Sequence, residues 1–455
     1  MRVFAITAVA AGVVASPAGA QQRPAAGTTT GYVPPATLLG DDGQPAAGGP
    51  GCSVPNITAS PSGDAIYFSN GGRSDVFRMT TANQKGEGAG QFSIFNFPDR
   101  PYSTNPNQRE VHVHDLSFNA AGNLVVTNPH RNPGPTGVAS GVGQLTQALQ
   151  LVNNVDIPNE PEVGNQSFLG GIYGAPNGDV WVVSSEFTGP EEITLVRPDG
   201  TTRSYVITPE GQPGPSLGGP LVFANGYVWA TGSMTVLNTD TPDPTDTRAS
   251  DVGVVVRLDP NTGQVTLVDQ HAGYIPGRME LGPDGAIYYV EQQRVANPMF
   301  GMPGAPFNTP RYFTGATGRI ARLDPATGQA THYTLPAGSN PVGLTFGGDG
   351  RIWFTSAAPA GTAANPTGAR QFVGALDTDS GQVQEFATPA GARGLADIDT
   401  GQAGDVYFSY QTAAGQCAIG SIWVCSGNQG QGQGRGRSVC APGQGGLPRG
   451  QGQNR

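Results

Sequence analysis

Seven copies of one short pattern constrain the fold of this 455-residue chain more than any other feature. Each copy has a polar turn with a glycine, followed by a segment rich in Val, Ile, Tyr, Trp and Phe, which are typical strand residues. Repeats of this length are typical of propeller blades rather than of helical solenoids, so the sequence predicts seven blades. The turn glycines lie 48 to 65 residues apart and are Gly63, Gly122, Gly178, Gly226, Gly285, Gly350 and Gly404.

A second phrase recurs three times, as RLDPNTGQV at 257–265, RLDPATGQA at 322–330 and ALDTDSGQV at 375–383. Its aspartate can accept backbone N–H groups in a turn, and its glycine can take the positive φ that closes a hairpin. We expect each copy to connect the third and outer strands of a blade. Almost no segment keeps a helical period without Gly or Pro. The prediction is an all-β, seven-bladed β-propeller with four-stranded antiparallel blades.

The ends of the chain differ from the repeats. Residues 1–20 contain an apolar run before Ala18-Gly19-Ala20, which is typical of a signal peptide cleaved after Ala20. We therefore expect a secreted or periplasmic protein, with a Pro/Gly/Ala-rich linker at 21–50, the propeller at 51–425 and a disordered Gly/Gln/Arg-rich tail at 426–455.

The last blade lacks an outer strand, because the glycine-rich sequence after residue 425 cannot form one. We predict that a segment before Asn56 supplies it. In an oxidising compartment the four cysteines should form disulfides, and Cys52 is expected to bond one of Cys417, Cys425 and Cys440 and to secure this closure. The pairing itself stays open.

The formal charge of −10 argues against a nucleic-acid partner, because phosphate binding needs a concentrated basic surface. No later apolar run is long enough for a membrane span. We expect a monomer whose partner is a small-molecule or peptide-like ligand.

The hexapeptide EVHVHD, residues 110–115, is the main candidate site, at the start of the innermost strand of the second blade. Side chains alternate along a strand, so Glu110, His112 and His114 should share one face. Two histidines two residues apart can reach one divalent ion or serve as acid and base. The alternative is two histidines bonded to backbone or solvent.

Other polar residues lie where inner strands of later blades begin. Arg278 and Glu280 belong to the fifth blade, and Arg393 and Asp397 to the seventh. Glu280 is a further candidate metal ligand. Arg278 and Arg393 could bind a substrate carboxylate or phosphate, or they could form salt bridges to Glu280 or Asp397 across the funnel. Asp397 is also a candidate substrate-binding residue.

Three further residues belong to second and outer strands. Glu291 ends the second strand of the fifth blade and is the candidate catalytic helper. His271 and His332 lie in or after outer strands, and we expect them to be solvated.

The stretches PVGLTFGGDGRIWFTS at 341–356 and GRMELGPDGAIYYVE at 277–291 resemble the repeat of the virginiamycin B lyase (streptogramin lyase) family of seven-bladed propellers. The similarity extends to related NHL and SMP-30 gluconolactonase-like propellers. It implies a metal-assisted C–O elimination at the central funnel, with Mg²⁺ and a His/Glu pair. The only Glu-x-His here is Glu110-Val111-His112, in the second blade rather than late in the chain, and Ser356 stands where the family pattern has Glu.

Two functions are therefore open. The first is a metal-dependent lyase or related hydrolase, with His112, His114 and Glu291 catalytic and Glu110, His112, His114 and Glu280 binding Mg²⁺ or Ca²⁺. The second is a non-catalytic periplasmic or extracellular scaffold that binds a ligand or a protein.

Overall fold

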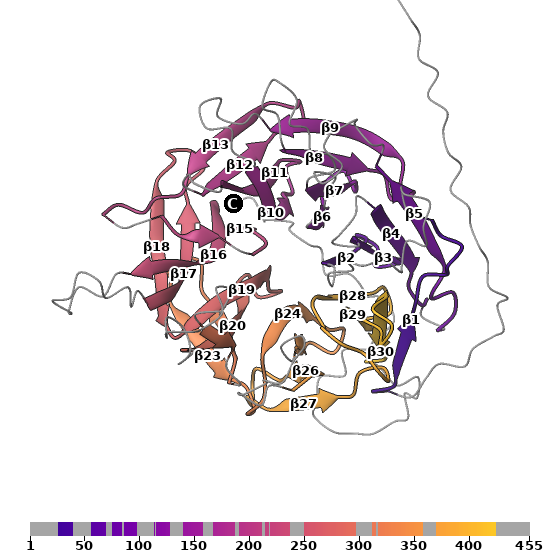
Figure 1. Ribbon diagram of the computed structural model, residues 1–455. Coiled ribbons are helices and arrows are strands. Elements are labelled where there is room, and N and C mark those ends of the chain that lie inside the picture. The colour runs from indigo at the N-terminus through magenta and orange to yellow at the C-terminus, as the bar shows by residue number, and fades with distance from the viewer. Residues whose placement is uncertain are drawn as a thin grey trace, which may run out of the picture.

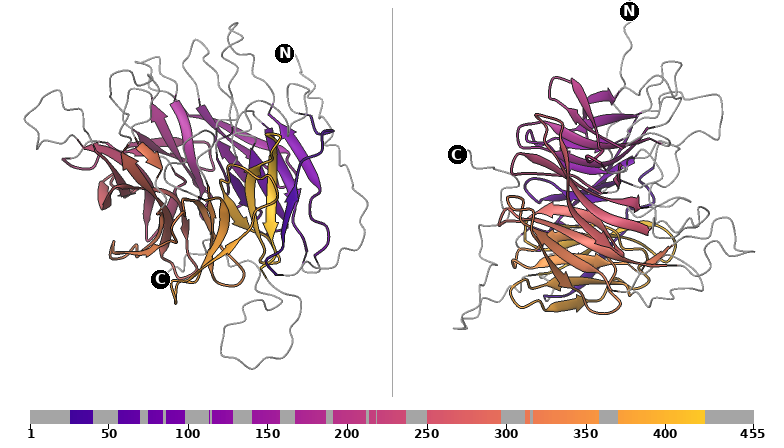
Figure 2. Two further views of the ribbon diagram at one scale, coloured as in Figure 1. Left: turned by 60° about the horizontal axis from the view of Figure 1, so that its bottom comes forward. Right: turned by 90° about the vertical axis from the view of Figure 1, so that its left-hand side faces the viewer.

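A computed structural model describes residues 26–39, 56–69, 75–83, 86–97, 113, 115–127, 140–157, 167–186, 191–211, 214–217, 219–236, 250–296, 312–314, 317–357 and 370–424. These residues form seven antiparallel sheets arranged in a ring (Figure 1). Figure 2 shows the same ring from two other directions. The seven-bladed β-propeller predicted from the repeats is confirmed. The described residues include no helix that could cross a lipid bilayer.

Each blade runs from an innermost strand at the axis to an outer strand at the rim (Figure 1). The first blade is β2 (Ile57–Ala59), β3 (Ala65–Ser69), β4 (Asp75–Thr80) and β5 (Phe92–Asn96). The second is β6 (Leu116–Phe118), β7 (Leu124–Thr127), β8 (Ser140–Leu145) and β9 (Leu151–Ile157). The third is β10 (Ser167–Gly174), β11 (Val180–Glu186), β12 (Glu192–Val196) and β13 (Thr202–Val206).

The fourth blade has a divided inner strand, because two short strands both pair with the second strand. It contains β14 (Ser216–Leu217), β15 (Val222–Ala224), β16 (Tyr227–Val236), β17 (Ser250–Leu258) and β18 (Val265–Ala272). The fifth contains β19 (Tyr274–Leu281), β20 (Ile287–Ala296), β22 (Arg319–Leu323) and β23 (Ala330–Thr334), with β21 (Tyr312–Thr314) paired to the far end of β20. The sixth is β24 (Pro341–Phe346), β25 (Ile352–Ser356), β26 (Phe372–Leu376) and β27 (Val383–Phe386).

The seventh blade closes the ring with strands from both ends of the chain. It consists of β28 (Ile398–Thr400), β29 (Val406–Gln411), β30 (Cys417–Ile422) and, as its outer strand, β1 (Thr29–Tyr32). Strand β1 is antiparallel to β30, with Thr29 opposite Ile422 and Tyr32 opposite Ile419. This confirms that a segment before Asn56 completes the last blade. The closing strand lies inside residues 21–50, the stretch that composition predicts to be a linker.

The recurring turns have the geometry expected from their residue types. All seven repeat glycines have positive φ, between 71° and 91°. In the first copy of the second phrase, the Asp259 Oδ1 accepts the backbone N–H of Asn261, and Gly263 has a φ of 79°. The three phrases join β17 to β18, β22 to β23 and β26 to β27, which are the predicted third-to-outer connections. These turns set the strand registers locally.

The core lies between neighbouring blades, because the strands near the axis are buried on both faces. Every residue of β3 and of β25 is buried. In the sixth blade Gly374 lies opposite Phe354, and a Cβ on Gly374 would come within 2.3 Å of the buried phenyl ring. Between blades, one buried cluster contains Val183 of the third blade and Val254 of the fourth, so neighbouring sheets are close-packed against each other.

Candidate functional site

Three charged residues from separate blades meet near the axis. Arg278 lies in β19, where the register shifts between Pro276 and Met279. Its Nε donates to Asp397 Oδ1 at 2.7 Å, and its Nη2 donates to Asp397 Oδ2. Its Nη1 lies 3.5 Å from Asp115 Oδ1. We call Asp115, Arg278 and Asp397 the axial ion cluster; it links the second, fifth and seventh blades.

The two aspartates of this cluster occupy equivalent positions and also bind backbone. Each directly precedes an innermost strand, β6 for Asp115 and β28 for Asp397. Asp115 Oδ2 accepts the N–H of Ile172 in the third blade at 3.0 Å. Asp397 Oδ2 accepts the N–H of Ile57 in the first blade at 2.9 Å. Each carboxylate therefore joins its own blade to the next one around the ring.

Burial shifts the pKa values of the residues in the axial ion cluster. The side chains of Asp115 and Asp397 are 3% and 4% exposed, and that of Arg278 is 18% exposed. Burial raises the pKa of Asp115 to about 6, although the charge of Arg278 and the Ile172 N–H act in the opposite direction. Burial also opposes the charge of Arg278, but Asp397 and Asp115 outweigh it and raise the pKa of the guanidinium. The pKa of Asp115 therefore lies above that of an ordinary aspartate.

The predicted substrate-binding residues do not all meet. Arg278 and Asp397 form the salt bridge that the sequence offered as the structural alternative to ligand recognition. Arg393 is exposed, and its backbone exchanges hydrogen bonds with Gln411 of the seventh blade. Glu280 lies in β19 opposite Tyr288 and is partly buried. Their roles toward a ligand stay predictions.

The hexapeptide EVHVHD is described only in part. Val113 is fully buried and Asp115 belongs to the axial ion cluster. Glu110, His112 and His114 lie outside the described residues. Strand β6 begins at Leu116, so the hexapeptide does precede the innermost strand of the second blade.

Glu291 belongs to a different cluster, away from the axial one in the fold. It lies in β20 directly opposite Arg319 of β22, and its side chain is fully buried. Arg319 donates to both carboxylate oxygens at 2.9 Å. His332 Nδ1 lies 2.8 Å from Glu291 Oε2, and His271 Nε2 lies 3.4 Å from Glu291 Oε1.

The expectation that His271 is solvated is wrong, whereas His332 is partly exposed and also bonded to Glu291. His271 is 9% exposed and its Nε2 lies 2.9 Å from Asp269 Oδ2, while the His332 side chain is 27% exposed. Burial opposes ionisation of Glu291, but the hydrogen bond from His332 and the charges of His271 and Arg319 outweigh it and lower its pKa. Outer strands are usually solvated, but here two outer strands face each other across a blade interface.

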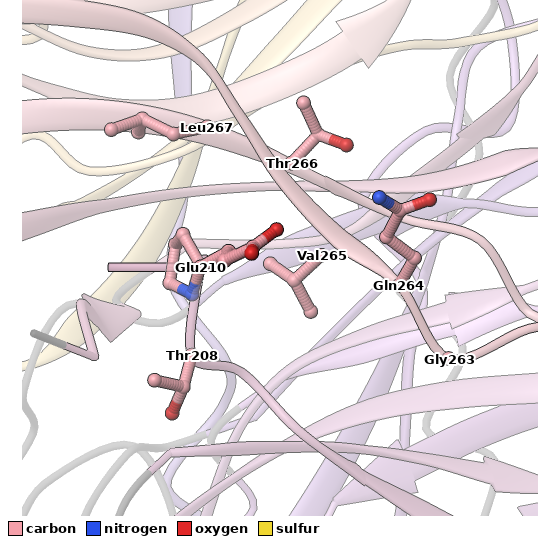
Figure 3. Close-up of a pocket in the computed structure, with 8 residues that line it drawn as sticks. Thr208, Glu210, Gly263, Gln264, Val265, Thr266 and Leu267 are labelled. Atoms are coloured by element: carbon pink, nitrogen blue, oxygen red, sulfur yellow. The ribbon is translucent and has the colours of Figure 1, made fainter. Parts of the chain in front are cut away.

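A hollow of about 500 Å³ lies at the rim, between the segment after β13 and the start of β18 (Figure 3). Of its eight lining residues, only Glu210 carries a charge. None belongs to the axial ion cluster or to the groups around Glu291. Its lining is mostly polar and lacks the apolar walls typical of a small-molecule pocket, so it gives no argument for a ligand site.

The comparisons with known proteins define no activity. No protein-family profile matches the sequence, and no curated protein matches it. A gluconolactonase from Xanthomonas campestris is 16% identical with a TM-score of 0.40, over 88% of this chain and 98% of the other. A protein from Bacteroides fragilis described as a candidate 6-phosphogluconolactonase is 13% identical with a TM-score of 0.42, over 72% and 82%.

A glycoside hydrolase 74 enzyme from Niastella koreensis is 13% identical with a TM-score of 0.49, covering 80% of this chain and 52% of that one. Similarities this distant carry no argument about substrate or chemistry. The resemblance to streptogramin lyases is not confirmed by them. What is established is a seven-bladed β-propeller with gluconolactonase-type propellers among its distant structural neighbours.

Proposed function

We propose that this protein is an exported propeller that binds a small or peptide-like organic ligand at the axial ion cluster, as a scaffold rather than as an enzyme. One observation carries the proposal: Arg278 holds Asp397 with one side of its guanidinium, while its Nη1 is 3.5 Å from Asp115 and the side chain keeps 18% of its surface exposed. The N-terminal signal-type sequence supports export.

The cluster suggests the polar pattern of the ligand. Arg278 can donate from Nη1 to a carbonyl or carboxylate oxygen. Asp115 is 3% exposed and accepts the backbone N–H groups of Leu116 and Ile172, so it positions Arg278 rather than contacting the ligand. Peptide-like and sugar-acid ligands, which carry carbonyl or carboxylate oxygens, therefore fit this arrangement.

The two aspartates favour binding over catalysis. Both are held by backbone N–H groups of the next blade, and Asp397 is also held by the guanidinium. Groups fixed in this way give a rigid recognition surface, because little side-chain entropy is lost when a ligand binds. They also keep the ring closed whether or not a ligand is present.

The test is a thermal-shift screen of the mature protein with short peptides, sugar acids and small carboxylates, followed by calorimetric titration of the compounds that stabilise it. Arg278→Lys should weaken binding at least about tenfold, because lysine lacks the planar fork. Arg322→Lys, at an exposed pair with Asp284, is the matched control and should leave affinity unchanged. The proposal fails if no compound binds, or if Arg278→Lys binds as tightly as the wild type.

A metal-assisted lyase is the second candidate, and the pKa of Asp115 favours it. A carboxyl with a pKa of about 6 beside a guanidinium could remove a proton from a carbon that is α to an amide carbonyl and adjacent to the carbon bearing an ester oxygen, while Arg278 holds the charge that develops on the amide oxygen. The bond between the second carbon and the ester oxygen then breaks, leaving an alkene and a carboxylate, with the proton on Asp115. Three of the four predicted metal ligands lie outside the described residues, so we assign no step to a metal.

Metal analysis separates the two functions. Mg²⁺ or Ca²⁺ present at one ion per chain, and lost in a His112→Ala/His114→Ala variant, would support the lyase. Unchanged metal content would remove these histidines from a metal site. Incubation with a cyclic depsipeptide, followed by mass spectrometry, should then show a ring-opened product of unchanged mass only if elimination occurs.

A further inference from the structure

We propose that Asp269, His271 and His332 form a binding site for a divalent transition-metal ion, with zinc preferred, between the fourth and fifth blades. One ligand atom from each residue lies within 4.8 Å of the other two. The site is separate from the axial ion cluster, and it does not depend on the ligand-binding function proposed above. We call these three residues the interblade triad.

Strand geometry explains why the triad converges. Asp269 and His271 are two apart in β18, so their side chains leave the same face of the fourth blade. His332 lies in β23, opposite Ala321 of β22. Ala321 packs in the core that joins these two blades, so His332 projects toward the fourth blade. The rings of His271 and His332 meet edge to face, with centroids 5.0 Å apart.

Buried Glu291 orients one of the imidazoles. Because the carboxylate is also bonded to Arg319, it accepts the Nδ1–H of His332 rather than donating a proton. That tautomer leaves the Nε2 lone pair of His332 available for a metal. A carboxylate behind a histidine is the usual support of a metal ligand, since it fixes the ring and raises its basicity. Arg319 is itself held over the ring of Tyr274, 3.7 Å from its centroid.

The formal charges also favour a cation. Asp269 and Glu291 supply two carboxylates to this cluster, and Arg319 supplies one fixed positive charge. With neutral histidines the formal net charge is therefore −1, which a divalent cation would offset.

The donor atoms select the class of metal. Two imidazole nitrogens and one carboxylate oxygen suit zinc and similar ions, whereas calcium and magnesium prefer oxygen-only sites. The side chains of Asp269 and His332 are 21% and 27% exposed, so water can reach a fourth position. An ion bound here would tie the outer edges of the two blades together.

The experiment uses the untagged mature chain, stripped with a chelator and titrated with Zn²⁺ and with Co²⁺. We expect one Zn²⁺ per chain at the triad, a rise in melting temperature on binding, and visible absorption from bound Co²⁺ that Zn²⁺ removes. Addition of Ca²⁺ or Mg²⁺ should not displace the ion. His332→Ala and Asp269→Asn, both at partly exposed positions, should abolish these signals without unfolding the protein.

Two further variants locate the effect. Glu291→Gln should weaken Zn²⁺ binding by about 10 to 100-fold, because the carboxylate that supports His332 and offsets the charge of Arg319 is lost while the three ligands remain. His112→Ala/His114→Ala should leave the triad's Zn²⁺ in place and so separates this site from the hexapeptide. Zn²⁺ affinity unaffected by His332→Ala, or a chelator-stripped chain that binds no Zn²⁺, would overturn the proposal.

Discussion

Replacing Arg278 with methionine tests the account of the axial ion cluster most directly. Methionine keeps the unbranched apolar stem but leaves Asp115 and Asp397, which are 3% and 4% exposed, without their cation. Removing one partner of a buried ion pair costs about 3–5 kcal/mol, because the remaining charge stays buried and uncompensated. We therefore expect Arg278→Met to lower the free energy of unfolding by that amount at pH 7.5.

The loss should depend on pH in a defined direction. Without the guanidinium, the folded-state pKa values of both carboxyls rise further above their unfolded values. The folded variant then binds protons that the unfolded chain does not, so the deficit shrinks as pH falls. At pH 5 it should be roughly half of its value at pH 7.5 or less.

The assay is urea unfolding followed by tryptophan fluorescence at both pH values, with the midpoint and slope compared between variants. Arg322→Met is the matched control. The side chains of Arg322 and Asp284 are 36% and 38% exposed, so that pair should contribute no more than about 1 kcal/mol. A loss for Arg278→Met no larger than the control's, or one that grows toward pH 5, would refute the reasoning.

Three further predictions follow from single features of the fold. Asp115→Asn should remove a pH dependence of stability. Because the pKa of Asp115 is raised to about 6, the wild type should lose stability relative to the variant as pH rises from 4 to 7, by at most about 3 kcal/mol. Urea midpoints measured across that range test this. Deleting residues 21–32 removes β1 and leaves the edge of the seventh blade unpaired, so the urea midpoint should fall and light scattering should show aggregation; an unchanged midpoint would mean that this strand does not close the ring. Gly374→Ala should lower the free energy of unfolding by about 1–3 kcal/mol, because its Cβ would meet the buried Phe354 ring. Gly170→Ala is the control: its Cβ would make only an ordinary contact at 3.7 Å, so the free energy of unfolding should change by no more than about 0.5 kcal/mol. Equal unfolding curves for the two variants would contradict this.

The disulfide expected between Cys52 and a C-terminal cysteine stays a prediction. Cys417 is fully buried at the start of β30, in the blade that β1 completes, while Cys52, Cys425 and Cys440 lie outside the described residues. Peptide mapping of reduced and oxidised protein would identify the pairing.

The sequence by itself determined the architecture, because turns and hairpins are local. A turn glycine that needs positive φ followed by an apolar strand recurs seven times, and a turn capped by its own aspartate recurs three times. Each pattern can be recognised within about ten residues. The same signals predicted the third-to-outer hairpins, such as the one at Gly263, and the missing outer strand of the last blade. Composition predicted a linker over residues 21–50, but it could not show that Thr29–Tyr32, within that range, forms the closing strand.

Only the tertiary structure decided which distant side chains meet. Arg278 could be placed on an inner strand from the repeat, but its partners were fixed by closure of the ring, which brings the second, fifth and seventh blades to one axis. His271 and His332 lie on outer strands, which are usually solvated, and nothing in either strand indicates that they flank Glu291. A contact within a blade follows from hairpin register, but a contact between blades depends on how one sheet packs against the next, which no local pattern encodes.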